Sequence, residues 1–272
     1  MRATSITLVP LGGLCNRMRA MASSVMIAQR KGCPIVVRWE KNRDCFANFL
    51  ELFEPVCIDG LSVSLTGQVD YWHKVARKRN IYLPRILRWY FFQHQLDDHT
   101  SLDDRTIETL HGSIFIISAG VLADCYPLKA LFVPTSEIQE TIDSLTSHFS
   151  EHVVGMHIRR TDNVKSIQQN DVDDFLRCMD KRLHDSPNVM FYVATDDRAV
   201  KQTMINRYGD RIIFHPAKLE RTSLQGMKDA VVDLWCLSQT KEIIGSYHSS
   251  YSEIAAQLGG AKLTILRRNA TT

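Results

Sequence analysis

The second half of the chain alternates short apolar, β-prone runs with segments of helical periodicity, and this alternation strongly limits the folds available to it. The runs predict strands at 153–160, 189–195, 211–215, 242–246 and 262–266, and the segments between them predict helices at 170–185, 197–207, 223–239 and 249–258. Repeated β–α units are typical of a parallel sheet covered by helices. The run at 153–158 is apolar on both faces, as a buried strand of such a sheet is. We therefore expect a Rossmann-like sheet in this half.

The first 40 residues carry the same kind of pattern. A strand is predicted at 6–11, a glycine turn at 12–14, a helix at 14–31 that ends at Gly32, and a strand at 34–39. We therefore expect an α/β protein of two Rossmann-like domains, 1–140 and 141–272, that face a ligand cleft.

The patterns between these two parts are weaker. They predict a short helix at 45–53, strands at 56–58 and 113–118, and a helix at 134–149. The basic and aromatic stretch 72–93 predicts an amphipathic helix from Pro84. We favour a helix that packs on the core and leaves a basic edge in solvent. The alternative is a helix on a membrane surface or near an acceptor glycan.

Composition excludes several classes of protein. The net charge of +3 and the absence of a Lys/Arg block argue against a nucleic-acid-binding protein. The seven cysteines have no metal-type spacing, and their odd number predicts reduced thiols in a reducing compartment. No apolar run approaches the roughly 20 residues of a membrane span. The short apolar run at the start is broken by Pro10 and is followed by arginines, which favours a first strand over a signal peptide. We expect a cytoplasmic protein, with peripheral membrane contact left open.

Two adjacent arginines, Arg159 and Arg160, end the predicted strand at 153–160, and Asp162 comes two residues later. Ligands of open α/β sheets bind beyond the carboxyl ends of the strands. Each guanidinium presents a planar fork of donors that suits phosphate oxygens, so the pair is a candidate diphosphate site. His157 lies on the same strand, two residues before Arg159. The alternative is a surface ion-pair cluster without a ligand.

Other candidate residues also fall where strands meet helices. Asn16 and Arg17 begin the first helix, whose amino end favours anions, although an ordinary tight turn explains them equally well. Asp196 and Asp197 follow the strand at 189–195 and either bind a sugar or nucleobase or cap the next helix.

Three further clusters have a functional and a structural interpretation. Asp233 shares a helix edge with Asp229, and a solvated acidic edge is the alternative to a ligand contact. Ser249 and Ser250 begin the helix at 249–258, where they either bind phosphate or cap the helix. The acidic run 171–174 matches the DxD pattern of metal-dependent sugar transferases, but we interpret it as the acidic first turn of a helix and expect no metal.

These motifs resemble those of the fucosyltransferase superfamily, which includes α1,2-, α1,6- (nodulation) and protein O-fucosyltransferases. Residues 157–162 resemble its HxRRxD motif, 12–17 its N-terminal Gly-Gly-Leu-x-Asn turn, and 194–197 its Ala-Thr-Asp-Asp element. Residues 223–239 and 246–252 are similar to its third motif region. The resemblance covers the first 30 residues and most of 153–260, but not 40–150.

The resemblance implies a GT-B fold and a hexosyltransferase that inverts the anomeric carbon, with GDP-fucose as donor substrate, a glycan as acceptor and no metal or other cofactor. It implies that Arg159 and Arg160 hold the diphosphate and stabilise the departing GDP, as catalytic residues. The implied donor-binding residues are Asn16, Arg17, His157, Asp162, Asp196, Asp197, Asp233, Ser249 and Ser250. Domain 141–272 would bind the nucleotide sugar, and domain 1–140 would lie on the acceptor side.

One departure from the family pattern affects the mechanism. In the α1,6 branch an acidic residue follows the motif, whereas this chain has Asn163 in place of a lysine and no carboxylate at 165–168. Either Asp171 acts as base or no strong base is needed. Two alternatives remain: a transferase that uses another nucleotide sugar, and a nucleotide-sugar-binding protein without transferase activity. A nicotinamide-dependent enzyme is disfavoured because the glycine fingerprint is absent.

Overall fold

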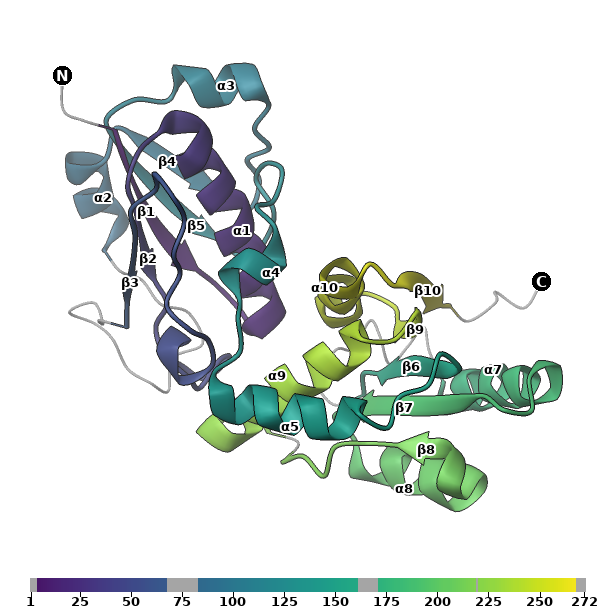
Figure 1. Ribbon diagram of the computed structural model, residues 1–272. Helices are drawn as coiled ribbons and strands as arrows, with labels where there is room; N and C mark the ends of the chain where they lie inside the picture. Colours follow the sequence, from purple (N-terminus) through teal and green to yellow (C-terminus); the bar gives the residue numbers. More distant parts are fainter. Residues whose placement is uncertain (1–3, 68–82, 161–170, 219, 268–272) are drawn as a thin grey trace. The chain divides into compact units, whose positions relative to one another are not determined.

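The computed structural model describes residues 4–67, 83–160, 171–218 and 220–267. The chain divides into two compact units: unit 1 comprises Met1–Thr135 and Arg221–Met227, and unit 2 comprises Ser136–Glu220 and Lys228–Thr272. Each unit contains one parallel five-stranded sheet with helices between its strands (Figure 1). The predicted α/β class with two Rossmann-like sheets is therefore confirmed.

The sheet of unit 1 has the strand order β3-β2-β1-β5-β4. Its strands are β1 (Ser5–Pro10), β2 (Ile35–Arg38), β3 (Val63–Thr66), β4 (His94–Asp97) and β5 (Ser113–Ser118). Its helices are α1 (Leu14–Lys31), the 3-10 helix η1 (Phe49–Glu51), α2 (Arg85–Phe91), α3 (Asp104–Thr109) and α4 (Leu128–Leu131). The helix α1 ends as predicted at Gly32, which adopts φ 56° and donates its N–H to the carbonyls of Ala28 and Gln29.

The predictions for residues 45–58 are wrong. The expected helix at 45–53 is only the turn η1, which brings the rings of Phe49 and Phe53 against Trp39 and Phe132 with centroids 5.3–6.5 Å apart. Phe49 and Phe53 are four residues apart, as on one face of a helix, but the cluster that holds them is a tertiary feature. The expected strand at 56–58 is replaced by a tight turn at Gly60, so Ile58 forms only an isolated bridge and the strand follows at 63–66.

The helix predicted from Pro84 exists as α2, but its predicted packing on the core is wrong. No residue of α2 is buried, and Ile86, Trp89 and Tyr90 are 83–85% exposed. The helix has fewer than two turns and lies near the edge strand β4, so it has little sheet surface to cover. Its anchor is Arg88, whose guanidinium carbon lies 4.7 Å from the ring centroid of Phe115.

The sheet of unit 2 has the order β10-β9-β6-β7-β8. Its strands are β6 (Val153–Ile158), β7 (Met190–Thr195), β8 (Ile212–Ile213), β9 (Glu242–Ser246) and β10 (Lys262–Leu266). Its helices are α5 (Ser136–Thr146), α7 (Val172–Asp185), α8 (Arg198–Tyr208), the 3-10 helix η2 (Gly209–Arg211), α9 (Leu224–Ser238) and α10 (Ser250–Gly259). All the strands and helices predicted in this half are present, although β8 at the edge is shorter than the expected 211–215.

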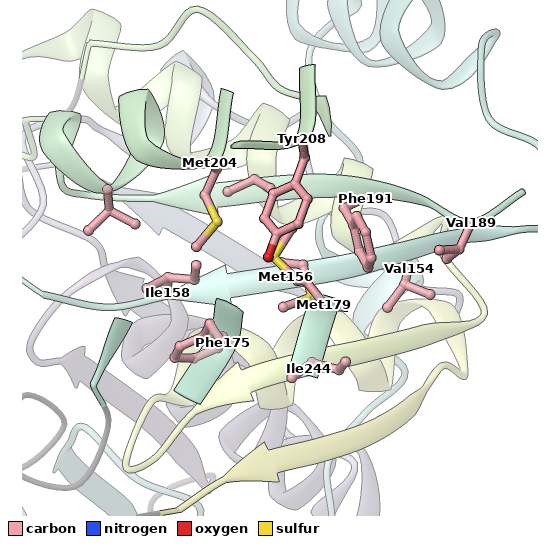
Figure 2. Close-up of a cluster of buried hydrophobic side chains, with 12 residues drawn as sticks. Val154, Met156, Ile158, Phe175, Met179, Val189, Phe191, Met204, Tyr208 and Ile244 are labelled. Carbon is pink, nitrogen blue, oxygen red and sulfur yellow. The ribbon is translucent and has the colours of Figure 1, made fainter. Parts of the chain in front are cut away.

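The two faces of β6 explain how unit 2 is held together. Val154, Met156 and Ile158 point into a hydrophobic cluster with side chains of α7 and α8 (Figure 2). The helix residues in this cluster are Phe175, Met179, Val200, Met204 and Tyr208. Burial of these side chains stabilises the fold of unit 2, because it removes apolar surface from water.

Gly155 and His157 lie on the other face of β6, because side chains alternate along a strand. A Cβ at Gly155 would lie 2.8 Å from Oγ1 of Thr240 and 3.0 Å from Cδ2 of Leu237. A glycine is therefore needed where the end of α9 approaches the sheet.

Candidate functional site

The carboxyl edge of the unit 2 sheet has the topology of a ligand site. From β6 the chain continues to β7 and β8 on one side, and it later returns to β9 and β10 on the other side. Ligands of doubly wound sheets bind where the strand order reverses in this way, beyond the carboxyl ends of the strands. Residues that follow β6, β7 and β9 therefore meet at one edge, and they include Arg159, Arg160, Asp196 and Ser249.

The two arginines after β6 are held by side chains from both neighbouring strands. The Arg159 N–H donates to Oγ of Ser246 (2.9 Å), which in turn donates to the carbonyl of His157 (3.2 Å). On the other side, the Arg160 N–H donates to Oδ1 of Asp196 (2.8 Å). Nε of Arg159 lies 3.2 Å from Oδ2 of the same carboxylate. Both arginines are partly exposed, so the site presents positive charge on a fixed backbone.

His157 forms a buried wall of this site. Its ring stacks on that of Tyr251, at the start of α10, with centroids 4.8 Å apart and planes at 27°. Burial lowers the pKa of His157 to about 3, and the positive charge of Arg159 contributes to the shift. Its Nδ1 has no hydrogen-bond partner within the described ranges. The imidazole is therefore neutral at ordinary pH and is poorly suited to act as a general base.

Asp197 caps α8. Its Oδ1 accepts hydrogen bonds from the N–H groups of Ala199 (2.8 Å) and Val200 (3.3 Å). The neighbouring Asp196 is turned instead toward the two arginines. Of the two interpretations that the sequence left open for this pair, capping accounts for Asp197 and a place in the arginine cluster for Asp196.

Asp233 lies against the face of the sheet. It is 9% exposed, and its Oδ1 accepts a hydrogen bond from the hydroxyl of Tyr192 (2.6 Å), a mid-strand residue of β7. Burial raises the pKa of Asp233 to about 6, against the stabilising effect of the Tyr192 hydroxyl. Asp229 is buried as well and accepts the N–H of Lys218 (2.7 Å). The interpretation of these carboxylates as a solvated acidic edge is wrong.

The amino end of α10 follows β9, next to β6. Ser249 occupies its N-cap position and is 8% exposed, but its side chain makes no capping hydrogen bond. Ser250 is the first residue of the helix and is partly exposed. His248, just before them, adopts φ 54°, a strained conformation for a residue other than glycine. Side-chain capping therefore does not explain Ser249.

In unit 1, Asn16 and Arg17 lie in the first turn of α1, after the carboxyl end of β1. Arg17 is fully buried. Its nitrogens donate to the carbonyls of Gly12 (2.9 Å) and Glu40 (2.6 Å) and to Oδ1 of Asn42 (2.7 Å). Asn16 is partly exposed and packs closely over Gly12. The donor contact predicted for Arg17 stays a prediction, although this burial leaves its guanidinium no surface for a ligand.

Asp162, Asn163 and the stretch 165–168 lie outside the described residues. The acidic run at 171–174 forms a capping box: the side chain of Asp171 accepts the N–H of Asp174, whose carboxylate accepts the Asp171 N–H (3.0 Å). The structural interpretation of this run is confirmed. Across the described ranges, no three His, Cys, Asp or Glu side chains gather as metal ligands would.

Two residues of the site were not singled out from the sequence. Ser246 ties β9 to the backbone of Arg159, and Tyr251 stacks on His157. Both belong to the hydroxyl-rich run 246–252, which the sequence marked as a group. A serine that ends a buried strand was the available signal for Ser246, whereas the partner of an aromatic ring cannot be identified without tertiary structure.

Comparisons with known proteins identify the fold. No protein-family model matches the chain, and no curated protein matches it in sequence. Among solved structures, NodZ alpha-1,6-fucosyltransferase soaked with GDP-fucose is 20% identical with a TM-score of 0.62, over 95% of this chain and 93% of that chain. A mutant of Arabidopsis thaliana FUT1 in complex with GDP is 15% identical with a TM-score of 0.63, over 100% and 71% of the two chains. POFUT1 in complex with GDP is 11% identical with a TM-score of 0.59, over 98% and 99%. These structural neighbours are all fucosyltransferases, and the chain has the GT-B fold that they share.

Proposed function

We propose that this chain is a glycosyltransferase that transfers L-fucose from GDP-fucose to a glycan acceptor. The observation that carries the proposal is the pair Arg159 and Arg160, held at the carboxyl edge of β6 by Ser246 and Asp196. The fold supports the same donor, because solved structures of this fold were obtained with GDP-fucose or GDP.

In this proposal the arginines bind the diphosphate and stabilise the charge that develops on GDP as it leaves. The carboxylate of Asp196 forms an ion pair with Nε of Arg159, so the Arg159 side chain is oriented before the donor arrives. The amino end of α10 adds N–H groups that favour an anion, together with the hydroxyls of Ser249 and Ser250. The site thus collects positive charge and hydrogen-bond donors where a diphosphate needs both.

The reaction we propose is a single displacement. An oxygen of an acceptor hydroxyl forms a bond to the anomeric carbon while the bond from that carbon to the diphosphate breaks, and GDP leaves with the electron pair. Attack from the opposite face inverts the configuration. The hydroxyl proton passes to water without a strong base, because the carboxylate of Asp171 caps α7 and the low pKa of the buried His157 makes it a poor proton acceptor. The arginine charges do the work that a divalent cation does in metal-dependent transferases, so we propose metal-independent transfer.

The roles of the other residues follow from their environment. Asp162 and Asn16 remain proposed donor contacts. The contacts of three other residues support structural roles. Asp197 caps α8, Asp233 is the buried hydrogen-bond partner of Tyr192, and Arg17 is a buried donor to the carbonyl of Glu40. We further propose that the C-terminal domain, 141–272, binds the nucleotide sugar and that the N-terminal domain, 1–140, lies on the acceptor side.

The location of the protein is proposed from its thiols. The seven cysteines form no disulfide, which agrees with a reducing compartment and supports a cytoplasmic protein. Within the described ranges, no helix is both long and apolar enough to cross a bilayer.

The test is a transfer assay with GDP-fucose and a panel of glycans in the presence of EDTA, with release of GDP as the readout. Loss of one group that stabilises the leaving charge typically lowers the rate about 10²–10³-fold, so Arg160→Ala should lose that much. Arg211→Ala, an exposed arginine of η2, is the matched control and should not change it. NMR of the product should show the anomeric configuration opposite to that of the donor.

Two other outcomes of this assay would replace the proposal. Turnover of a different nucleotide sugar, but not of GDP-fucose, would reassign the donor. Tight binding of GDP-fucose without transfer to any glycan would favour a nucleotide-sugar-binding protein.

A further inference from the structure

A hollow in unit 1, outside the site described above, has a distinct chemical lining. It has a volume of about 540 Å³ and lies between α2 and the edge strand β4. Its lining includes Arg85, Arg88, Trp89, Gln93, Gln95 and Asp97. The volume falls within the roughly 300–1,000 Å³ typical of small-molecule sites.

The alternation of side chains along β4 builds one wall of this hollow. Gln95 and Asp97 share a face of β4, because residues two apart on a strand point the same way. Gln93, just before the strand, also lines the hollow. Gln93 is oriented by the Ser113 N–H, which donates to its Oε1 (2.7 Å). Across the described ranges, Gln95 makes no side-chain hydrogen bond, so its amide is available to a ligand. This wall offers amide and carboxylate groups in a row.

The opposite wall comes from α2. Nε of Arg88 donates to the carbonyl of Leu83 (2.6 Å), and its guanidinium lies over the ring of Phe115, so this side chain is anchored. The neighbouring Trp89 is 83% exposed. Together with the other exposed apolar side chains of α2, it forms an apolar patch, and such patches mark candidate binding surfaces. The indole of Trp89 lines the hollow, so it provides a flat apolar surface beside hydrogen-bonding groups.

We propose that this hollow binds a neutral oligosaccharide. Sugars have hydroxyls that both donate and accept, and the lining contains donors on Arg85, acceptors on Asp97 and both kinds on Gln95. Their apolar C–H faces stack on aromatic rings such as that of Trp89. A carboxylate in the lining disfavours an anion, and two arginines disfavour a cation. The assignment of this oligosaccharide as part of the acceptor rests on the proposed transfer reaction, whereas its binding here does not.

A membrane surface is the competing occupant, because Ile86 and Tyr90 are exposed on the same helix as Trp89. Charge does not decide between the two, because Arg85 and Arg88 would attract anionic lipid headgroups whereas Asp97 would repel them. We favour the oligosaccharide because a hollow suits a small ligand better than it suits a flat bilayer.

The test measures binding of the full chain to immobilised cello-, chito- and manno-oligosaccharides. Stacking on an aromatic ring is worth about 0.5–1.5 kcal/mol, which corresponds to as much as about tenfold in Kd. We expect at least one of these glycans to bind, Trp89→Ala to raise its Kd about tenfold and Trp89→Phe to retain most of the affinity. Tyr90→Ala is the matched control: Tyr90 is as exposed as Trp89 and adjacent to it, but it does not line the hollow. It should leave the Kd unchanged.

Three results would overturn the inference. The first is that none of these glycans binds, and the second is that Trp89→Ala and Tyr90→Ala weaken binding equally. The third is binding to phosphatidylglycerol vesicles that both substitutions abolish. Binding of GDP-fucose, measured in the same variants, tests the unit 2 site separately, so loss of one function is distinguishable from loss of the other.

Discussion

Asp196 contacts both arginines of the candidate site: its Oδ1 accepts the N–H of Arg160 at 2.8 Å, and its Oδ2 lies 3.2 Å from Nε of Arg159. One carboxylate at the end of β7 therefore positions the backbone of one arginine and the side chain of the other. The negative charge of Asp196 offsets part of the positive charge of the two arginines. We therefore expect Asp196 to serve the site by positioning the arginines and not by strengthening its attraction for an anion.

We expect Asp196→Ala to weaken binding of GDP-fucose about tenfold, because hydrogen bonds to charged groups contribute about 1.5–3 kcal/mol. Asp196→Asn should fall between this variant and the wild type, since its amide oxygen can still accept the Arg160 N–H. Titration calorimetry measures the effect, with Asp210→Ala, an exposed acid of η2, as control. Equal affinity in wild type and Asp196→Ala would remove the positioning role.

His157 should make the protein less stable in acid. Its pKa is about 3 in the folded chain, against about 6.5 when exposed. As pH falls from about 6.5 to 3, the unfolded chain takes up a proton that the folded chain does not, so the free energy of unfolding falls by up to about 1.4 kcal/mol per pH unit. His157→Phe keeps a ring on Tyr251 and should lack this contribution. Urea denaturation at several pH values checks it, and parallel pH profiles for the two proteins would contradict it.

Asp233 should make the protein less stable as the pH rises, which is the opposite of the effect of His157. Its folded pKa is raised to about 6, so its contribution to stability is full below about pH 4 and is lost as pH rises through 6. Asp233→Asn keeps an oxygen for the Tyr192 hydroxyl and should lack this loss. In the same denaturation series, the stability of wild type relative to Asp233→Asn should therefore decline between pH 4 and 6. A constant difference would mean that the carboxylate is not held neutral.

Arg17 should be essential for the stability of unit 1. Arg17→Ala removes three buried hydrogen bonds, to the carbonyls of Gly12 and Glu40 and to Oδ1 of Asn42, and we expect it to cost about 3 kcal/mol or more of unfolding free energy. Arg17→Lys should recover little, because one ammonium cannot reach three acceptors in the geometry of the guanidinium fork. Chemical denaturation measures both. Normal stability combined with weak GDP-fucose binding would instead support the donor contact expected from the sequence.

The parts of the fold that could be predicted from the sequence are those with a local signal. The strand at 242–246 is a short apolar run bounded by polar residues, and α1 has both a helical period and a terminal glycine at 32. Phe49 and Phe53 also have a helical spacing, but the turn that carries them is held by ring contacts with Trp39, which follows β2. These contacts form only in the folded chain, so the expected helix at 45–53 was wrong.

The same distinction holds for the candidate site. Arg159, Arg160 and Asp196 were predictable because they lie within two residues of the end of a strand, and parallel strands end at one edge. The burial of Asp233 was not, because α9 is buried on more than one side, including Val232 and Trp235 next to it. A helical period locates one buried face and does not identify a second.

Titration calorimetry of GDP-fucose into wild type, Arg160→Ala and Arg211→Ala, with EDTA present, decides whether the arginine pair is a diphosphate site. We expect binding to the wild type and to Arg211→Ala, and a loss of about 1.5–3 kcal/mol of binding free energy in Arg160→Ala, as for charge-assisted hydrogen bonds. If the wild type binds no GDP-fucose, or if Arg160→Ala binds it equally well, the arginine pair is not a diphosphate site.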